Sequence, residues 1–210
     1  MAKTSRIFAT EKPLILASGS PRRQQYFHDL GLIYKVRGAD VIENLLPNEE
    51  PEGFVLRMAV EKAVAVMNVY PESWVVAADT VVTIDGLILG KPKDQDDAVA
   101  LLMRLAGRDH YVRTGFCIGC LRENLRTIES VVTKVTFAHF SEDIARSYAA
   151  TGEPLDKAGA YGIQGRGAFL VSTLSGSYSN VVGLPLHEVV TALCRYGVIG
   201  SIRGTGSLSV

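Results

Sequence analysis

The sequence is poor in cysteine, with three in 210 residues, at positions 117, 120 and 194. Three cysteines are too few for a disulfide framework, so we expect a protein of a reducing compartment, the cytoplasm. An excess of charge of either sign is also absent, because Lys plus Arg and Asp plus Glu both total 22. Proteins that bind nucleic-acid polymers usually carry a basic surplus. We therefore expect no polymeric nucleic-acid partner, while a local basic pocket can still hold a small anionic ligand.

Long apolar runs are missing as well. No stretch of 18 or more apolar residues occurs, and the first thirteen residues contain no signal-peptide core. This composition predicts a soluble chain that makes no membrane contact. The sequence also contains neither G-x-S-x-G nor a Walker A pattern, which disfavours a serine hydrolase and a P-loop NTPase.

What is present is an alternation of apolar runs, helical periodicities and turn residues. Helices are expected at residues 22–30, 51–69, 95–106, 142–150 and 186–196. Strands are expected at residues 13–17, 33–36, 74–78, 81–83, 87–89, 111–121 and 125–138, and residues 152–183 show little helical periodicity. The pattern predicts a three-layer α/β protein with a mixed central sheet and one long antiparallel hairpin. We assign a single domain to residues 13–197 and expect loose termini at 1–12 and 198–210.

The stretch from Leu14 to Arg23 has the composition of an anion site. An apolar run stops at a Ser/Gly turn, Ser20 can cap a helix, and Pro21 suits its first position. Free N–H groups and the positive end of the helix dipole then face one point, where Arg22 and Arg23 add forks suited to phosphate. The alternative is an ordinary strand–turn–helix with a solvated basic first turn.

Asp79 follows a continuous apolar strand and is placed by the pattern at the carboxyl end of that strand. Ligands of open α/β sheets gather at such ends, and a carboxylate there can hold a divalent ion or activate water. The alternative is an aspartate that only makes a turn.

Two lysines and a glutamine are further candidates. Lys91 is fixed between a glycine and a proline, and Lys62 lies beside the apolar face of a long helix. Each can also be an ordinary surface lysine. Gln164 stands between glycines, where its amide can meet a nucleobase edge. Cys117 and Cys120 fall on opposite faces of an expected strand, which favours packing over a zinc site.

In order along the chain, these segments resemble the Maf family of nucleotide pyrophosphatases, within the larger inosine-triphosphatase-like fold. The resemblance runs from Leu14 to about Leu193. It rests on ASGSPRR (17–23), ADT (78–80), KP (91–92), DKAGAYGIQG (156–165) and GSYSNVVGLPL (176–186). The resemblance implies a cleft between two lobes. It also implies hydrolysis of nucleoside triphosphates to the monophosphate and pyrophosphate with a divalent cation, Mg²⁺ or Mn²⁺.

The segment KAGAYGIQG (157–165) is similar to the corresponding segment in the branch of the family that acts on dTTP and UTP. Membership of this branch implies a role in sanitising the nucleotide pool, one that extends to modified pyrimidine nucleotides. The resemblance implies Asp79 and Glu43 as catalytic carboxylates and metal ligands, with Lys91 as a third catalytic residue. It implies a set of substrate-binding residues, of which Arg22, Thr80 and Gln164 correspond to positions linked with substrate selection. The set is Ser18, Arg22, Arg23, Lys62, Thr80 and Gln164. Members are often dimers, so a homodimer is a further expectation.

Two alternatives stay open. One is a non-enzymatic nucleotide-binding regulator of cell division, which would bind nucleotide in the same basic pocket without turnover. The carboxylates Asp79 and Glu43 argue against it, since binding alone needs no group that activates water. The other is a pyrophosphatase for 7-methyl-GTP or another modified nucleotide.

Overall fold

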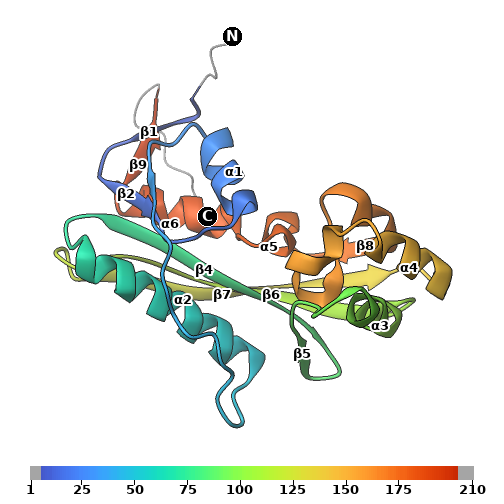
Figure 1. Ribbon diagram of the computed structural model, residues 1–210. Helices are drawn as coiled ribbons and strands as arrows, with labels where there is room; N and C mark the ends of the chain where they lie inside the picture. The colour runs from blue at the N-terminus through green and yellow to red at the C-terminus, as the bar shows by residue number, and fades with distance from the viewer. Residues whose placement is uncertain (1–5, 203–210) are drawn as a thin grey trace.

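The computed structural model describes residues 6–202 and is built on one mixed, seven-stranded sheet (Figure 1). Its strand order is β3-β2-β4-β6-β7-β8, with β5 paired to β4 beyond the end of β2. The pairs β2/β3 and β2/β4 are parallel, and all the others in this sheet are antiparallel. The expectation of a mixed α/β sheet is confirmed.

The strands are β1 (Phe8–Thr10), β2 (Leu14–Leu16), β3 (Lys35–Val36), β4 (Trp74–Ile84), β5 (Leu87–Leu89), β6 (Asp109–Cys120), β7 (Leu125–Phe137), β8 (Val171–Ser175) and β9 (Ile199–Ser201). The α-helices are α1 (Pro21–Asp29), α2 (Pro51–Val69), α3 (Gln95–Leu105), α4 (Glu142–Ala149), α5 (Tyr178–Val182) and α6 (Leu186–Arg195). Three short 3₁₀ helices, η1 (Glu153–Asp156), η2 (Ala158–Ala160) and η3 (Gly165–Leu170), fill the glycine-rich segment.

Helices cover both faces of the sheet, which makes the three layers (Figure 1). On one face α2 packs along β4 and β6, with Ala59 and Ala63 against Ala77. On the other face α1 and α6 cover the β2 end, where Phe27 and Leu193 meet Trp74. The opposite end of that face is covered by α3, α4 and η2. Because these two groups of helices have separate apolar cores, they form two lobes on one shared sheet.

The long strand β4 has an open stretch on its β2 edge. Its residues pair with β2 only up to Val76, and with β5 only from Val82. Between them, Ala77–Val81 have no strand neighbour on this edge among residues 6–202. Their side chains alternate between the α2 face and the α1/α6 face. The open stretch therefore exposes Asp79 to one layer and Thr80 to the other.

The placement of Asp79 at the end of a strand is wrong. Strand β4 runs unbroken through Asp79 and Thr80 to Ile84 before turning at Asp85–Gly86 into β5. The strand continues because β6 pairs with it along its whole other edge, from Val75 to Thr83. It is β2, not β4, whose carboxyl end lies beside Asp79.

The expectation of loose termini is wrong for the residues that the structure describes. Strand β1 pairs antiparallel with β9, with Phe8 opposite Ser201, so residues 8–10 and 199–201 stabilise each other. The rest of those expected termini, residues 1–5 and 203–210, lies outside the described residues. Strand β8 and helix α5 were also missed, because their short segments carry no clear periodicity.

Cys117 and Cys120 lie on opposite faces of the sheet, as their spacing predicts. Cys117 packs in the cluster beneath α2, and Cys120 packs in the cluster beneath α6. Burial raises the pKa of Cys117 to about 11, so this thiol stays protonated at neutral pH. Among residues 6–202, no helix is long and apolar enough to cross a membrane.

Candidate active site

A cleft of about 870 Å³ lies at the open stretch of β4, between the two lobes. Every residue predicted for the site lines it: Ser18, Arg22, Arg23, Glu43, Lys62, Asp79, Thr80, Lys91 and Gln164. These residues come from α1, α2, β4, the glycine-rich segment and the loops that follow β2, β3 and β5. The volume is within the range of pockets that hold small-molecule ligands.

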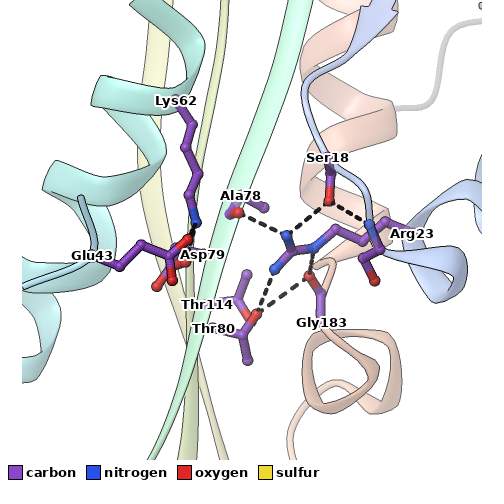
Figure 2. Close-up of polar contacts among 10 residues, drawn as sticks. Ser18, Arg23, Glu43, Lys62, Ala78, Asp79, Thr80, Thr114 and Gly183 are labelled. Atoms are coloured by element: carbon purple, nitrogen blue, oxygen red, sulfur yellow. Dashed lines mark hydrogen bonds and ion pairs between the residues drawn. The ribbon is translucent and has the colours of Figure 1, made fainter. Parts of the chain in front are cut away.

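On the α2 side of β4, one ammonium group joins two carboxylates (Figure 2). Lys62 Nζ lies 2.6 Å from Asp79 Oδ1 and 2.6 Å from Glu43 Oε1. The Asp79 side chain is 11% exposed, whereas the Glu43 side chain is 55% exposed and comes from the loop between β3 and α2. The inner carboxylate is therefore fixed by the sheet, and the outer one is carried by a loop.

On the other side of β4, Arg23 is bound to uncharged groups (Figure 2). Its Nη1 donates to the Ala78 carbonyl at 2.8 Å and to Ser18 Oγ at 3.2 Å. Its Nε donates to the Gly183 carbonyl at 2.7 Å, and its Nη2 donates to Thr80 Oγ1 at 3.0 Å. Four of the five N–H donors of a guanidinium are thus used within the protein. Burial lowers the pKa of Arg23, although nearby Asp79 opposes this shift.

The hydroxyl of Thr80 extends this network into the sheet. Besides its bond from Arg23, Thr80 Oγ1 lies 2.9 Å from Thr114 Oγ1, on β6. Thr114 Oγ1 donates in turn to the carbonyl of Asn180, whose side-chain amide is buried and donates to Val112 O. Through these bonds, Arg23 connects α1, β4 and the segment around α5 into one unit.

The remaining predicted residues are more exposed. Arg22 Nη1 reaches across the cleft to Asp156 Oδ2 at 3.5 Å, which links α1 to η1. Lys91 is exposed and makes no side-chain hydrogen bond or ion pair among residues 6–202. The amide of Gln164 is likewise exposed and without a partner in that range. These last two groups are available to a ligand.

Helix α1 begins at Pro21 with Ser20 at its N-cap position, as predicted, but the Ser20 side chain makes no capping hydrogen bond. Instead, Ser18 Oγ accepts from the backbone N–H of Ser20 at 3.2 Å. Ser18 is 7% exposed, and its hydroxyl oxygen also accepts from Arg23. This serine holds the turn that places the helix N-terminus at the cleft, where the dipole favours an anion.

Tyr161 and His110 form a buried hydrogen-bonded pair at the cleft wall. Tyr161 lines the cleft, and its hydroxyl lies 2.8 Å from Nε2 of the fully buried His110. Burial lowers the pKa of His110 to about 4, so this imidazole is neutral at pH 7. Tyr161 packs edge-on against His110 and Phe137, so these two rings support the one aromatic side chain of the three that lines the cleft.

Glu43 and Asp79 are suited to a divalent cation. Each has a carboxylate oxygen 2.6 Å from the same nitrogen of Lys62, so those oxygens are no further apart than twice that distance. Mg²⁺ in nucleotide enzymes is commonly held by one or two carboxylates, with phosphate and water completing its shell. No cluster of three or more His, Cys, Asp or Glu side chains suited to a metal occurs among residues 6–202. A cation held here would have these two carboxylates as its protein ligands, with the rest of its coordination shell supplied by a bound ligand and water.

Several residues of this region had no individual signal in the sequence. Asp156 and Lys157 pair with each other at the cleft wall, and Gly183 supplies a carbonyl to Arg23. Glu153 and Tyr148 bind the backbone of the glycine-rich segment. A backbone acceptor has no sequence signature, and the fold alone brings Arg23 and Gly183, 160 positions apart, into contact.

A family model described as Maf-like protein matches residues 13–196. A protein of Desulfotalea psychrophila named dTTP/UTP pyrophosphatase is 56% identical over 193 residues, covering 92% of this chain and 99% of its own. Proteins of the same name from Nitratidesulfovibrio vulgaris and Geobacter sp. strain M21 are 48% and 46% identical, over 91% and 90% of this chain and 91% and 97% of theirs. The solved structure of the Staphylococcus aureus Ham1 protein aligns with a TM-score of 0.43 and 16% identity, over 60% of this chain and 72% of that one.

Proposed function

The chain belongs to the Maf-like protein family, and from this membership we propose that it hydrolyses dTTP and UTP to the nucleoside monophosphate and pyrophosphate. The relatives named dTTP/UTP pyrophosphatase, 44–56% identical over most of the chain, support this activity. The observation that carries it in the structure is the convergence of Asp79, Glu43 and Lys62 in a cleft that also presents Arg22 and Lys91.

In this proposal the two carboxylates act on water and the basic side chains act on phosphate. Asp79 accepts a proton from the water whose oxygen bonds to the α phosphorus, while the bond from that phosphorus to the α–β bridging oxygen breaks and the bridging oxygen leaves with the pyrophosphate. Lys91 and Arg22 stabilise the charge that develops on the leaving pyrophosphate. The N-terminus of α1, with Ser18, receives a phosphate oxygen. Gln164 reads the edge of the pyrimidine with its free amide.

Asp79 and Glu43 are the residues that would hold a divalent cation, Mg²⁺ or Mn²⁺. When bound, such an ion supplies positive charge to the phosphates and lowers the pKa of a coordinated water. Lys62, which lies 2.6 Å from an oxygen of each carboxylate, then orients both of them toward one place. Asp79 is the better anchored of the two carboxylates, because it lies within a strand paired along its other edge.

The test of the activity is pyrophosphate release from dTTP, UTP, CTP, GTP and 7-methyl-GTP, each with Mg²⁺ and with Mn²⁺. We expect dTTP and UTP to be the preferred pair. A preference for 7-methyl-GTP would assign the chain to the other branch. Tight nucleotide binding by calorimetry with no product from any nucleotide would favour the non-enzymatic regulator of cell division.

The test of Asp79 is the Asp79→Asn variant, which keeps the shape and removes the charge. We expect turnover to fall on the order of a hundredfold or more, because a central acid–base or charge-stabilising group is lost. Asp85→Asn is the matched control, since Asp85 lies in the exposed turn after the same strand and should leave turnover unchanged. Near-wild-type turnover by Asp79→Asn would refute the role given to Asp79.

We also propose a cytoplasmic location and a homodimer. The three cysteines are free, which suits a reducing compartment. The balanced charge of the sequence supports a small nucleotide rather than a nucleic-acid polymer as partner. Light scattering of the purified chain measures the oligomeric state.

A further inference from the structure

The loop that carries Gln164 is held by a carboxylate outside the cleft. Gln164 lies between Tyr161 and η3, and its amide has no partner among the described residues. An amide that discriminates between bases must be held in position before the base arrives, since misplacement weakens its hydrogen bonds. The positioning therefore has to come from the backbone on either side of Gln164.

Glu153 provides it on the C-terminal side. Its Oε2 accepts from the backbone N–H of Arg166 at 3.1 Å, and its Oε1 accepts from the backbone N–H of Gly167 at 3.1 Å. Burial by itself would raise the pKa of Glu153, but these bonds and one from Tyr148 lower it overall. The carboxylate is ionised at neutral pH and binds two consecutive amides, as an anion does in a backbone nest.

Tyr148 provides the positioning on the N-terminal side. Its hydroxyl donates to Glu153 Oε1 at 2.9 Å and accepts from the backbone N–H of Gly162 at 3.2 Å. Tyr148 is 3% exposed and comes from α4, packed in the core of that lobe. Burial raises the pKa of Tyr148, which keeps this hydroxyl protonated and able to donate.

The loop also has the shape that this arrangement needs. A Cβ atom on Gly167 would lie 2.6 Å from the Gly162 carbonyl oxygen and would collide with the Tyr148 hydroxyl. Gly162 and Gly167 therefore approach each other around the tyrosine, and Gln164 stands at the turn between them. One carboxylate and one hydroxyl bind three backbone amides that flank Gln164 on both sides.

We propose that Glu153, acting with Tyr148, is a positioning residue for base selection, which holds the Gln164 loop in the conformation that reads a pyrimidine. This inference rests on the proposed function of the cleft. Neither side chain is among the residues that line the cleft, so both act through Gln164 and not on the substrate.

The test is Glu153→Gln, which keeps the size of the side chain and removes its charge. We expect KM for UTP to rise about tenfold and the preference for UTP over CTP to fall by a similar factor, with kcat within about threefold. Tyr148→Phe keeps the ring and should shift KM in the same direction by less. Glu142→Gln is the matched control, because Glu142 is an exposed glutamate on α4 that pairs only with Arg146 among the described residues.

A double-mutant cycle separates positioning from a general loss of structure. If Glu153 acts through Gln164, the variant Glu153→Gln/Gln164→Ala has the same KM and selectivity as Gln164→Ala alone. Additive effects, an unchanged UTP preference in Glu153→Gln, or a fall in kcat without a change in KM would each overturn the proposal.

Hydrogen exchange distinguishes this proposal from the proposed activity. We expect Glu153→Gln to speed amide exchange in residues 162–167 by about tenfold, with no change in Glu142→Gln. If the wild type hydrolyses none of the nucleotides, the proposed function fails on that result alone. Unchanged exchange in Glu153→Gln would refute the positioning role whether or not the wild type is active.

Discussion

The two sides of the open stretch of β4 hold their cations in different ways. On the α2 side, Lys62 is bound by two carboxylates. On the other side, Arg23 is bound by two carbonyls and two hydroxyls (Figure 2). A charged ligand competes directly with the first arrangement, since a divalent cation attracts the same carboxylates and a phosphate attracts the ammonium. The neutral carbonyls and hydroxyls that bind Arg23 are not in such competition with a charged ligand.

The difference indicates a division of labour. On the Lys62 side, the ion pairs can rearrange when substrate binds, which suits residues that take part in the hydrolysis. The Arg23 side loses hydrogen bonds if Arg23 turns toward a phosphate, and buried acceptors left without donors are costly. We expect Arg23 to serve mainly as the support that fixes the helix N-terminus and Gly183, with at most one N–H directed at substrate. Its assignment as a substrate-binding residue stays a prediction.

The largest effect that tests this comparison is expected for Lys62→Met. Turnover should fall on the order of a hundredfold, because the carboxylates lose the cation that orients them. With Mg²⁺ present, the midpoint of thermal unfolding should change by only a few degrees, since the ion can balance the same charges. Steady-state kinetics and thermal denaturation with and without Mg²⁺ measure both quantities. Wild-type turnover in Lys62→Met would contradict the catalytic role given to the Lys62 side of β4.

The second effect is on stability, in Arg23→Lys. Lysine keeps the charge but lacks the planar fork, so we expect the free energy of unfolding to fall by about 3 kcal/mol. Urea denaturation measures this change. Arg22→Lys is the control, because Arg22 makes one partly exposed ion pair and should lose no more than about 0.5 kcal/mol. Equal losses at the two positions would contradict the supporting role of Arg23.

His110 adds a third basic group, one that burial keeps neutral. Because its pKa is lowered to about 4, from the usual value of 6.5, the unfolded state binds more protons between these pH values. Its contribution to stability is complete above pH 6.5 and should be lost as the pH falls toward 4, by about 3 kcal/mol. Denaturation of the wild type and of His110→Gln across this range measures the difference. His28→Gln, at an exposed histidine, should keep the wild-type slope.

The smallest effect is expected for Thr80→Val, which removes one hydroxyl from the Arg23 network. We expect a loss of about 1 kcal/mol in the free energy of unfolding. Thr80→Ser keeps the hydroxyl and should restore most of it. If Thr80→Val alters the choice of nucleotide without altering stability, Thr80 contacts the substrate and does not act through Arg23.

The sequence predicted the strongly periodic elements well. Helix α2 spans Pro51–Val69, as expected from its apolar spacing, and Asp94 caps α3 by accepting from Asp97 N. The pairing of β1 with β9 was not predictable, because each strand is three residues long and the paired residues are about 190 positions apart in sequence. Tertiary pairing along β6, not local sequence, carries β4 through Asp79.

The candidate site shows the same limit. Residues with distinctive side chains, such as Lys91 and Gln164, were found because their glycine and proline neighbours single them out, and they line one cleft. Glu153 and Tyr148 were not found, because they bind backbone N–H groups, which every residue but proline possesses. Which backbone N–H group such a side chain binds is decided by the three-dimensional fold, so this kind of role cannot be predicted from sequence.

The pairing of β1 with β9 places the first and last strands of the described residues side by side. Phe8 lies opposite Ser201, so a short peptide would be enough to join the start of β1 to the end of β9. Circular permutants with new ends in the exposed turn at Asp85–Gly86 would then be expected to fold, because that turn lies outside both apolar cores. Conversely, deleting either terminal strand leaves the other without its hydrogen-bonding partner. Strands β1 and β9 therefore depend on each other for their strand pairing, although they lie at opposite ends of the described chain.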